Sequence, residues 1–154
     1  NGRLDTLQAA ILSAKLTIFE DEIAARQCVA DRYAMLLADL AAVGQITLPV
    51  LRPHNTSAWA QYTIRVPDRD QIQQYLAEQG IPSAVHYPAP LYDQPALAQS
   101  IQDCPESDRA AQEVLSLPMH PYLDEAALVR VANALSEAFA DLPNKCTQSA
   151  AAEG

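Results

Sequence analysis

Residues 5–40 carry apolar side chains at steps of three and four, the spacing of one face of a helix. The residues on this face are Leu7, Ile11, Ala14 and Ile18, and those that widen it are Leu12 and Leu16. An acidic run at residues 20–22 suits the first turn of a further helix, because a helix N-terminus favours negative charge. We predict a helical arm over residues 1–40, made of two helices or of one helix bent near residues 17–20, with Gly44 ending it.

The pattern becomes β-like after Gly44. Three stretches are expected as strands, at residues 45–50, 58–66 and 81–87, and the second is rich in β-branched and aromatic residues. A helix is expected between the last two strands, over residues 68–79, with Gly80 as its C-terminal stop. The alternation of the second strand places two sets of side chains on opposite faces, Trp59, Gln61, Thr63 and Arg65 on one and Tyr62, Ile64 and Val66 on the other. The residues expected on the buried side of the helix are Ile72, Tyr75 and Leu76.

The C-terminal third alternates proline-framed stretches with helical patterns. Short helical pieces are expected at residues 95–99 and 106–115, an extended piece at 117–123, and a last amphipathic helix at 125–140 capped by Asp124. The polar composition beyond Pro143 can bury little and predicts disorder. We therefore predict an α+β fold with long N-terminal helices and a small, mainly antiparallel sheet. Its parts are a helical arm at 1–40, a domain at 41–141 and a disordered tail at 142–154.

Composition narrows the function classes. The 154 residues carry a formal net charge of −9, which argues against a nucleic-acid partner, since phosphate binding needs a basic surface. No stretch approaches the roughly 18 apolar residues of a membrane span, so we expect no membrane partner. The three cysteines lack CxxC spacing and predict free thiols in a reducing compartment, and we expect a cytoplasmic protein. The three histidines are roughly thirty residues apart, a spacing that gives a metal site little support.

The opening residues carry one candidate site. Asn1 and Gly2 are typical of a tight turn, and Asp5 is expected to cap the first helix, with Gln8 three residues later as in a capping box. Asn1 and Arg3 would then present an amide and a guanidinium, which are suitable donors for phosphate or carboxylate oxygens. The alternative is that Arg3 is an ordinary surface arginine. Because the sequence starts without Met and inside a motif, we expect it to be a fragment.

His86 and Tyr87 form a second candidate site. They end a predicted strand just before Pro88, where the sheet would fix their position and the following loop would expose them. The alternative is a hydrogen-bonded surface pair without a functional role. His120, framed by Met119 and Pro121, is expected to be structural, and His54 is expected to be solvated in a loop.

Several sequence blocks, taken in order, resemble one enzyme family. The blocks are NGRLD at 1–5, LQAAIL at 7–12, KL at 15–16, Arg26 with Tyr33, SAW at 57–59 with Tyr62, GIP at 80–82, VHYP at 85–88, PL at 90–91 with QP at 94–95, and LSLPMHP at 115–121. Together they resemble the sugar aminotransferases of the DegT/DnrJ/EryC1/StrS family, which are fold-type I enzymes that use pyridoxal phosphate (PLP). The similarity is greatest to members that aminate a UDP-linked 3-oxo-hexuronate for surface polysaccharide such as O-antigen.

The resemblance implies a fold, a cofactor and a set of site residues. The chain would be the C-terminal small domain of an aspartate-aminotransferase-like PLP enzyme, with residues 1–40 as an inter-domain arm. Asn1 would reach the cofactor phosphate of the other subunit of a homodimer, with Arg3 in the phosphate or substrate environment. His86 and Tyr87 would line the UDP-sugar site across the interface. The amino donor would be one such as glutamate.

The residue that forms the Schiff base has no match in the chain. The family places this lysine upstream of the block at residues 1–5, whereas Lys15 matches a non-catalytic position and Lys145 lies in the predicted tail. This chain alone is therefore expected to be inactive. Two alternatives remain open. Some family members carry His in place of the lysine and act as sugar dehydratases, or the chain is a non-catalytic binding or dimerisation module.

Overall fold

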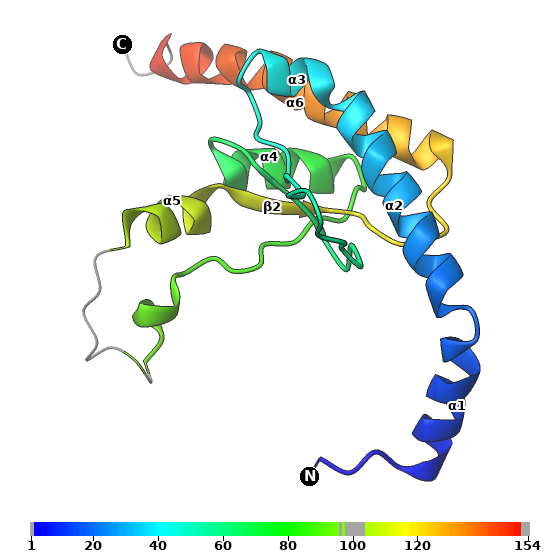
Figure 1. The fold of residues 1–154 in the computed structure, drawn as a ribbon. Helices are drawn as coiled ribbons and strands as arrows, with labels where there is room; N and C mark the ends of the chain where they lie inside the picture. Colours follow the sequence, from blue (N-terminus) through cyan, green and yellow to red (C-terminus); the bar gives the residue numbers. More distant parts are fainter. Residues whose placement is uncertain (1, 96, 98–103, 152–154) are drawn as a thin grey trace.

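The computed structural model describes residues 2–95, 97 and 104–151, and for residues 142–151 it describes the backbone alone. A small α+β domain and a projecting helix, α1, make up the described chain (Figure 1). Three helices of the domain, α2, α4 and α6, lie on one side of a two-stranded sheet formed by β1 and β2. The predicted α+β class therefore agrees with the structure.

The N-terminal helices are α1 (Thr6–Leu16), α2 (Phe19–Leu36) and α3 (Ala38–Ala42). Asp5 caps α1 as predicted, because the Gln8 N–H donates a hydrogen bond to Asp5 Oδ1 at 2.8 Å. Helix α1 ends at Leu16 and α2 begins at Phe19, which decides between the two alternatives in favour of separate helices. Gly44 follows α3 with a φ of 75°, a left-handed conformation that suits a helix end without a Cβ.

The sheet pairs β1 (Tyr62–Arg65) with β2 (Val114–Leu117) in antiparallel register, with Tyr62 opposite Leu117 and Arg65 opposite Val114. Single-residue bridges extend it on both sides, from Thr47 to Arg65 and from Ala84 to Ser116. The strands predicted at 45–50 and 81–87 are thus wrong in extent, since each contributes one bridge.

Strand β2 also corrects the prediction of a helix over residues 106–115. The helix, α5 (Pro105–Glu113), ends one residue before β2 begins. A four-residue strand that joins a helix without an intervening glycine or proline gives little local signal. Its pairing with β1 decides its conformation, and this partner is distant in sequence.

The hydrophobic core lies between the sheet and the helices α2, α4 (Arg69–Glu78) and α6 (Glu125–Ala151). The predicted alternation in β1 is confirmed, since Tyr62, Ile64 and Val66 are buried whereas Thr63 and Arg65 are half-exposed. Ile72 and Leu76 are fully buried on α4, and Tyr75 packs at the core's edge. The largest fully buried side chains are Tyr33, Leu37, Tyr62, Ile64, Val66, Ile72, Leu76, Leu115 and Leu135.

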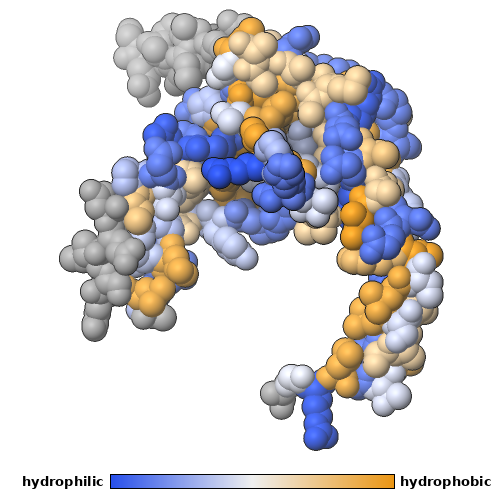
Figure 2. Space-filling view, in the orientation of Figure 1, coloured by the Kyte–Doolittle hydropathy of each residue, from blue (hydrophilic) through white to orange (hydrophobic). Residues whose placement is uncertain are grey.

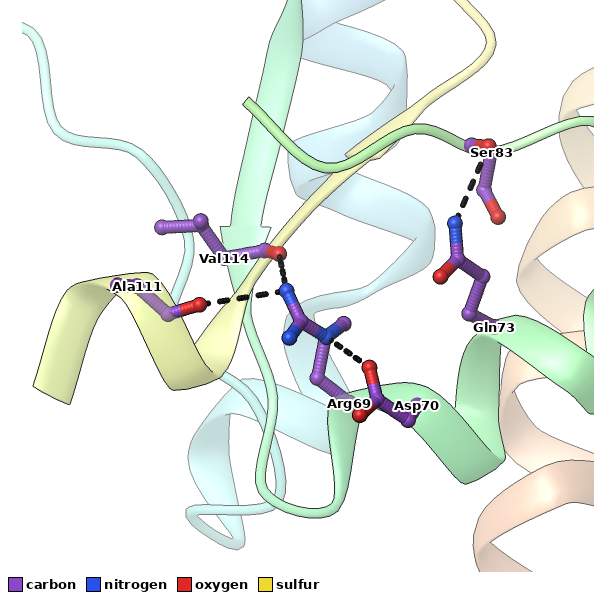
Figure 3. Close-up of polar contacts among 6 residues, drawn as sticks. All are labelled: Arg69, Asp70, Gln73, Ser83, Ala111 and Val114. Carbon is purple, nitrogen blue, oxygen red and sulfur yellow. Dashed lines mark hydrogen bonds and ion pairs between the residues drawn. The ribbon is translucent and has the colours of Figure 1, made fainter. Parts of the chain in front are cut away.

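Arg69 joins α4 to the junction of α5 and β2 (Figure 3). Its side chain is only 10% exposed, and Nη1 donates to the carbonyl oxygens of Ala111 at 3.3 Å and Val114 at 3.5 Å. Nε donates to Asp70 Oδ1 at 2.5 Å, which pairs the buried charge. These bonds satisfy carbonyls at the end of α5 that the helix itself leaves without partners.

Two segments of the C-terminal third differ from the prediction. A 3₁₀ turn occurs at Leu91–Asp93, and most of the helical piece predicted at 95–99 lies outside the described residues. Helix α6 continues to Ala151, so the tail predicted as disordered from residue 142 has a helical backbone up to that point. The stretch includes Pro143, Asn144 and Thr147, which have low helix propensity, so no local pattern in the sequence indicates that the α6 backbone continues this far.

Candidate functional site

The face of the sheet opposite the core carries a line of polar side chains that includes one sequence-predicted site residue, His86. Thr63 and Ser116 are opposite each other on β1 and β2, and their hydroxyl oxygens are 2.8 Å apart. Ser116 Oγ also lies 3.3 Å from His86 Nδ1. Ser116 is 5% exposed, whereas His86 is exposed, so the line runs from the protein interior to the surface.

A pocket of about 260 Å³ opens beside this line of side chains. His86 and Ser116 lie in its wall, together with Gln61, Ser83 and residues 117–119. The wall combines apolar side chains with a few polar groups, an arrangement common to sites that bind small organic molecules. The pocket is therefore the candidate binding site that the described residues form around His86.

Interactions on the core side hold two parts of the pocket wall in place. The Tyr33 hydroxyl donates to the carbonyl oxygen of Pro118 at 2.9 Å, and the Tyr33 ring stacks on Tyr62 with centroids 4.9 Å apart. Trp59 packs against Tyr62 and donates from Nε1 to Gln27 Oε1 at 2.7 Å. Burial, followed by the negative charge of Asp31, raises the pKa of Tyr62 to about 12, in keeping with a phenol held in the core.

Tyr87 lies next to this pocket but is not part of its wall. Its side chain is 76% exposed, and its ring meets the His86 ring edge-on with centroids 6.0 Å apart. The two residues are adjacent as the sequence suggests, and both side chains face solvent. A large exposed aromatic ring beside a polar group is well suited to contact a ligand that arrives from outside the domain.

The first candidate site is separate from the pocket within this chain. Arg3 is exposed in the segment before α1, far from the sheet in Figure 1, whereas Asn1 lies outside the described residues. No hydrogen bond or ion pair to Arg3 occurs among residues 2–95, 97 and 104–141. Its guanidinium is therefore presented to solvent next to the α1 N-terminus.

The other two histidines considered from the sequence, His120 and His54, lie outside the pocket wall. His120 Nδ1 accepts a hydrogen bond from the Tyr122 N–H at 3.2 Å, in keeping with the structural role expected for it. His54 is exposed in a loop with a φ of 72°. Within the described ranges, no three His, Cys, Asp or Glu side chains come together as metal ligands. Nor does any described helix have the length and apolar character to cross a membrane.

Sequence reasoning missed Thr63 and Ser116. Ser116 is a polar residue within an apolar run, between Leu115 and Leu117, and this position gives a weak signal of a specific hydrogen bond. Its partners become visible only with the pairing of β1 and β2.

Comparison with known proteins identifies the family. The family model described as "DegT/DnrJ/EryC1/StrS aminotransferase family" matches residues 1–136. The chain belongs to this family. Members of the DegT/DnrJ/EryC1/StrS family are PLP-dependent aminotransferases with the fold-type I architecture, which agrees with the resemblance seen in the sequence blocks.

Individual family members are similar over most of this chain. UDP-2-acetamido-2-deoxy-3-oxo-D-glucuronate aminotransferase of Pseudomonas aeruginosa is 49% identical over 136 residues, which is 88% of this chain and 37% of that enzyme. A family aminotransferase from Brucella abortus superposes with a TM-score of 0.80 at 40% identity, over 88% of this chain and 36% of the other. NtdA of Bacillus subtilis, solved with bound cofactor PMP, gives 0.77 at 29% identity, with 88% and 32% covered. The chain thus spans about a third of the length of these relatives.

Proposed function

We propose that this chain is part of a sugar-nucleotide aminotransferase that transfers an amino group, with glutamate as donor, to a UDP-linked keto-sugar for surface polysaccharide. The observation that carries the proposal is the 49% identity to the P. aeruginosa enzyme, which extends over 88% of this chain. The pocket beside His86 supports it, because it combines apolar walls with polar groups that suit a sugar ring.

The proposal gives the two candidate sites separate roles. His86 and Tyr87 contact the sugar nucleotide through an imidazole and an exposed aromatic ring. Asn1 and Arg3 contact the phosphate of the cofactor or the acidic groups of the substrate. The segment before α1 lies far from the sheet in Figure 1, and this separation supports a homodimer in which each subunit contributes to the site of the other.

The described residues suit the phosphate end of the cofactor. A guanidinium is a strong donor to phosphate oxygens, and Arg3 presents one without an ion-pair partner among the described residues. PLP, when bound, supplies the electron sink for amino-group transfer, and its lysine comes from outside this chain in our proposal. The residues of this chain bind and orient, whereas the full-length protein is needed for activity.

Helix α1 presents an apolar surface that supports placement in a larger protein. Leu7, Ile11, Leu12 and Leu16 are all at least 49% exposed, and Figure 2 shows their helix as a band of apolar atoms. An exposed apolar surface of this kind is typical of an interface. We propose that the part of the full-length polypeptide outside these 154 residues covers it, since this chain spans 37% of the P. aeruginosa relative.

The experiment is an assay of the full-length protein with PLP, glutamate and UDP-linked 3-oxo sugars, in which the aminated sugar is detected by mass spectrometry. We expect bound PLP to be visible in the absorbance spectrum and an amino sugar to form. A dehydrated sugar instead of an amino sugar would assign the protein to dehydration chemistry. Absence of PLP binding by a folded full-length protein would contradict the proposal.

Variants then test the residue roles. His86→Ala is expected to raise the KM for the sugar nucleotide about tenfold or more, because an imidazole hydrogen bond is lost. His54→Ala, in an exposed loop, is the matched control and should leave the KM unchanged. Arg3→Ala is expected to weaken cofactor or sugar-nucleotide binding. Arg52→Ala is its control, because Arg52 is also an exposed arginine outside the helices and strands. Unchanged constants for both ligands would return Arg3 to the status of an ordinary surface residue.

A further inference from the structure

Three side chains form a continuous hydrogen-bonded line across the open face of the sheet. Thr63 Oγ1 lies 2.8 Å from Ser116 Oγ, and Ser116 Oγ lies 3.3 Å from His86 Nδ1. Ser116 is buried at the centre of the line and His86 is exposed at its end. The line connects β1, β2 and the segment that follows Ala84.

The place of the one unpaired proton favours one direction for this line of hydrogen bonds. A serine hydroxyl has one proton and donates to one neighbour at a time. If Ser116 donates to His86 Nδ1, Thr63 donates to Ser116, and both hydroxyl protons have acceptors. In the opposite direction Ser116 donates to Thr63, and the described residues provide no acceptor for the Thr63 proton. Each direction leaves one donor without a partner among the described residues, which is His86 Nε2–H in the first and the Thr63 hydroxyl in the second. The first direction places this donor on His86, the more exposed of the two residues, where solvent or a ligand can accept its hydrogen bond.

This direction fixes which ring nitrogen of His86 carries the proton. A neutral imidazole has one donor nitrogen and one acceptor nitrogen. When Nδ1 accepts a hydrogen bond from the Ser116 hydroxyl, Nε2 carries the ring proton and is the donor. No described residue hydrogen-bonds to Nε2, and His86 lies in the wall of the pocket. The line of hydroxyls therefore leaves His86 with a donor available to a ligand.

The backbone before His86 is also held in place. Ser116 N donates to Ala84 O at 2.7 Å, and Ala84 N donates to Ser116 O at 3.1 Å. Gln73 Nε2, on α4, donates to Ser83 O at 3.4 Å, as drawn in Figure 3. Ser116 thus contacts the segment twice through its backbone and once through its hydroxyl, which limits the positions that the imidazole can adopt.

We propose that Thr63 and Ser116 are positioning residues, which hold His86 in the tautomer that carries its proton on Nε2, so that His86 donates a hydrogen bond to an oxygen of the substrate. The substrate part of this inference rests on the proposed function. Keto, carboxylate and phosphate oxygens of a sugar nucleotide all accept hydrogen bonds, so a donor at this position can bind any of them.

The tautomer is tested by ¹⁵N–¹H correlation NMR on the histidine-labelled full-length protein near pH 8.5, where an ordinary imidazole is neutral. His86→Gln assigns the His86 signals. We expect the Nε2–H form in the unaltered chain and in Thr63→Ser, which keeps the hydroxyl. Thr63→Val and Ser116→Ala should shift the signals towards a mixture of both tautomers. The Nδ1–H form in the unaltered chain, or unchanged signals in both variants, would overturn the proposal.

The same variants in the full-length protein test the consequence for binding. Thr63→Val and Ser116→Ala are expected to raise the KM for the sugar nucleotide about three- to tenfold with a smaller change in kcat, while Thr63→Ser keeps the original KM. An unchanged KM in variants whose tautomer has shifted would overturn the positioning role. If the full-length protein binds no sugar nucleotide, the proposed function fails, but the NMR measurement still decides the arrangement of Thr63, Ser116 and His86.

Discussion

Helices α1 and α2 are neighbours along the chain, but only α2 packs into the core of the domain. Helix α2 buries Val29, Ala30 and Tyr33 against the domain, with exposures of 5% or less. Helix α1 has no buried residue, although Leu7 and Leu16 repeat the spacing of a helix face. The spacing of apolar residues thus predicts a helix in both cases. It does not show whether the surface against which the helix packs belongs to the same part of the chain.

The largest expected effect comes from truncating one leucine of the buried core and, for comparison, one leucine on α1. Leu76→Ala removes a fully buried side chain on α4 and should lower the free energy of unfolding by about 2–5 kcal/mol. Leu12→Ala on α1 should change it by less than about 0.5 kcal/mol, since Leu12 is 49% exposed. Urea unfolding of the 154-residue chain measures both, with Trp59 fluorescence as a probe inside the domain. Equal losses would show that α1 belongs to the domain's cooperative unit.

A smaller effect is expected for the buried polar contacts of the domain. Arg69→Met leaves the carbonyls of Ala111 and Val114 without this donor and should lower the free energy of unfolding by about 1–3 kcal/mol. Arg109→Met is the matched control, because Arg109 is 57% exposed and pairs with Glu106 on the surface. The control should change stability by less than about 1 kcal/mol. Similar losses in both variants would argue against a specific role for the buried guanidinium.

The smallest effect is expected at the exposed pair of Arg32, on α2, and Glu125, on α6. Hydrogen bonding to Arg32 lowers the pKa of Glu125 below its ordinary value of 4.5. A carboxyl with a lowered pKa in the folded state adds stability above its unfolded pKa, and this contribution is lost as the pH falls through the folded pKa. The stability difference between the unaltered chain and Glu125→Gln should therefore be present at pH 7 and shrink below about pH 4.5.

Arg32→Gln separates this pair from the effect of an acidic residue at the start of α6. It removes the pair but keeps Glu125 near the helix N-terminus, where a negative charge is favourable by itself. We expect the same pH dependence of urea midpoints in both variants. A pH-dependent difference in Glu125→Gln alone would assign the effect to the helix terminus instead of the pair.

The sequence predicts the local features of the fold better than the distant contacts. The cap at Asp5, the alternation of side chains in β1 and the buried side of α4 follow from spacing within a few residues. Strand β2 was missed because its four residues obtain their conformation from β1, about fifty positions earlier in the chain. Helix α6 was cut short because composition indicates how little a segment can bury, and not where its backbone hydrogen bonds stop.

In the candidate site, too, the local features were predicted and the distant contacts were not. His86 was a candidate because it follows a predicted strand and precedes Pro88, both of which are local features. Ser116 was not, because its contact with His86 depends on the bridge between residues 84 and 116 and on the pairing with Thr63. The role of a hydroxyl depends on its neighbours, and these come from three separate parts of the chain.

The antiparallel pairing of β1 with β2 has a consequence for how the domain forms during synthesis. The ribosome releases residues 62–65 well before their partners at 114–117, and α2 must also wait for α6, which it contacts through Arg32 and Glu125. Early segments can form helical turns, but their apolar faces stay uncovered until the last helix emerges. A nascent chain that stalls before residue 114 would expose the inner face of β1, where chaperones and proteases recognise unfinished proteins.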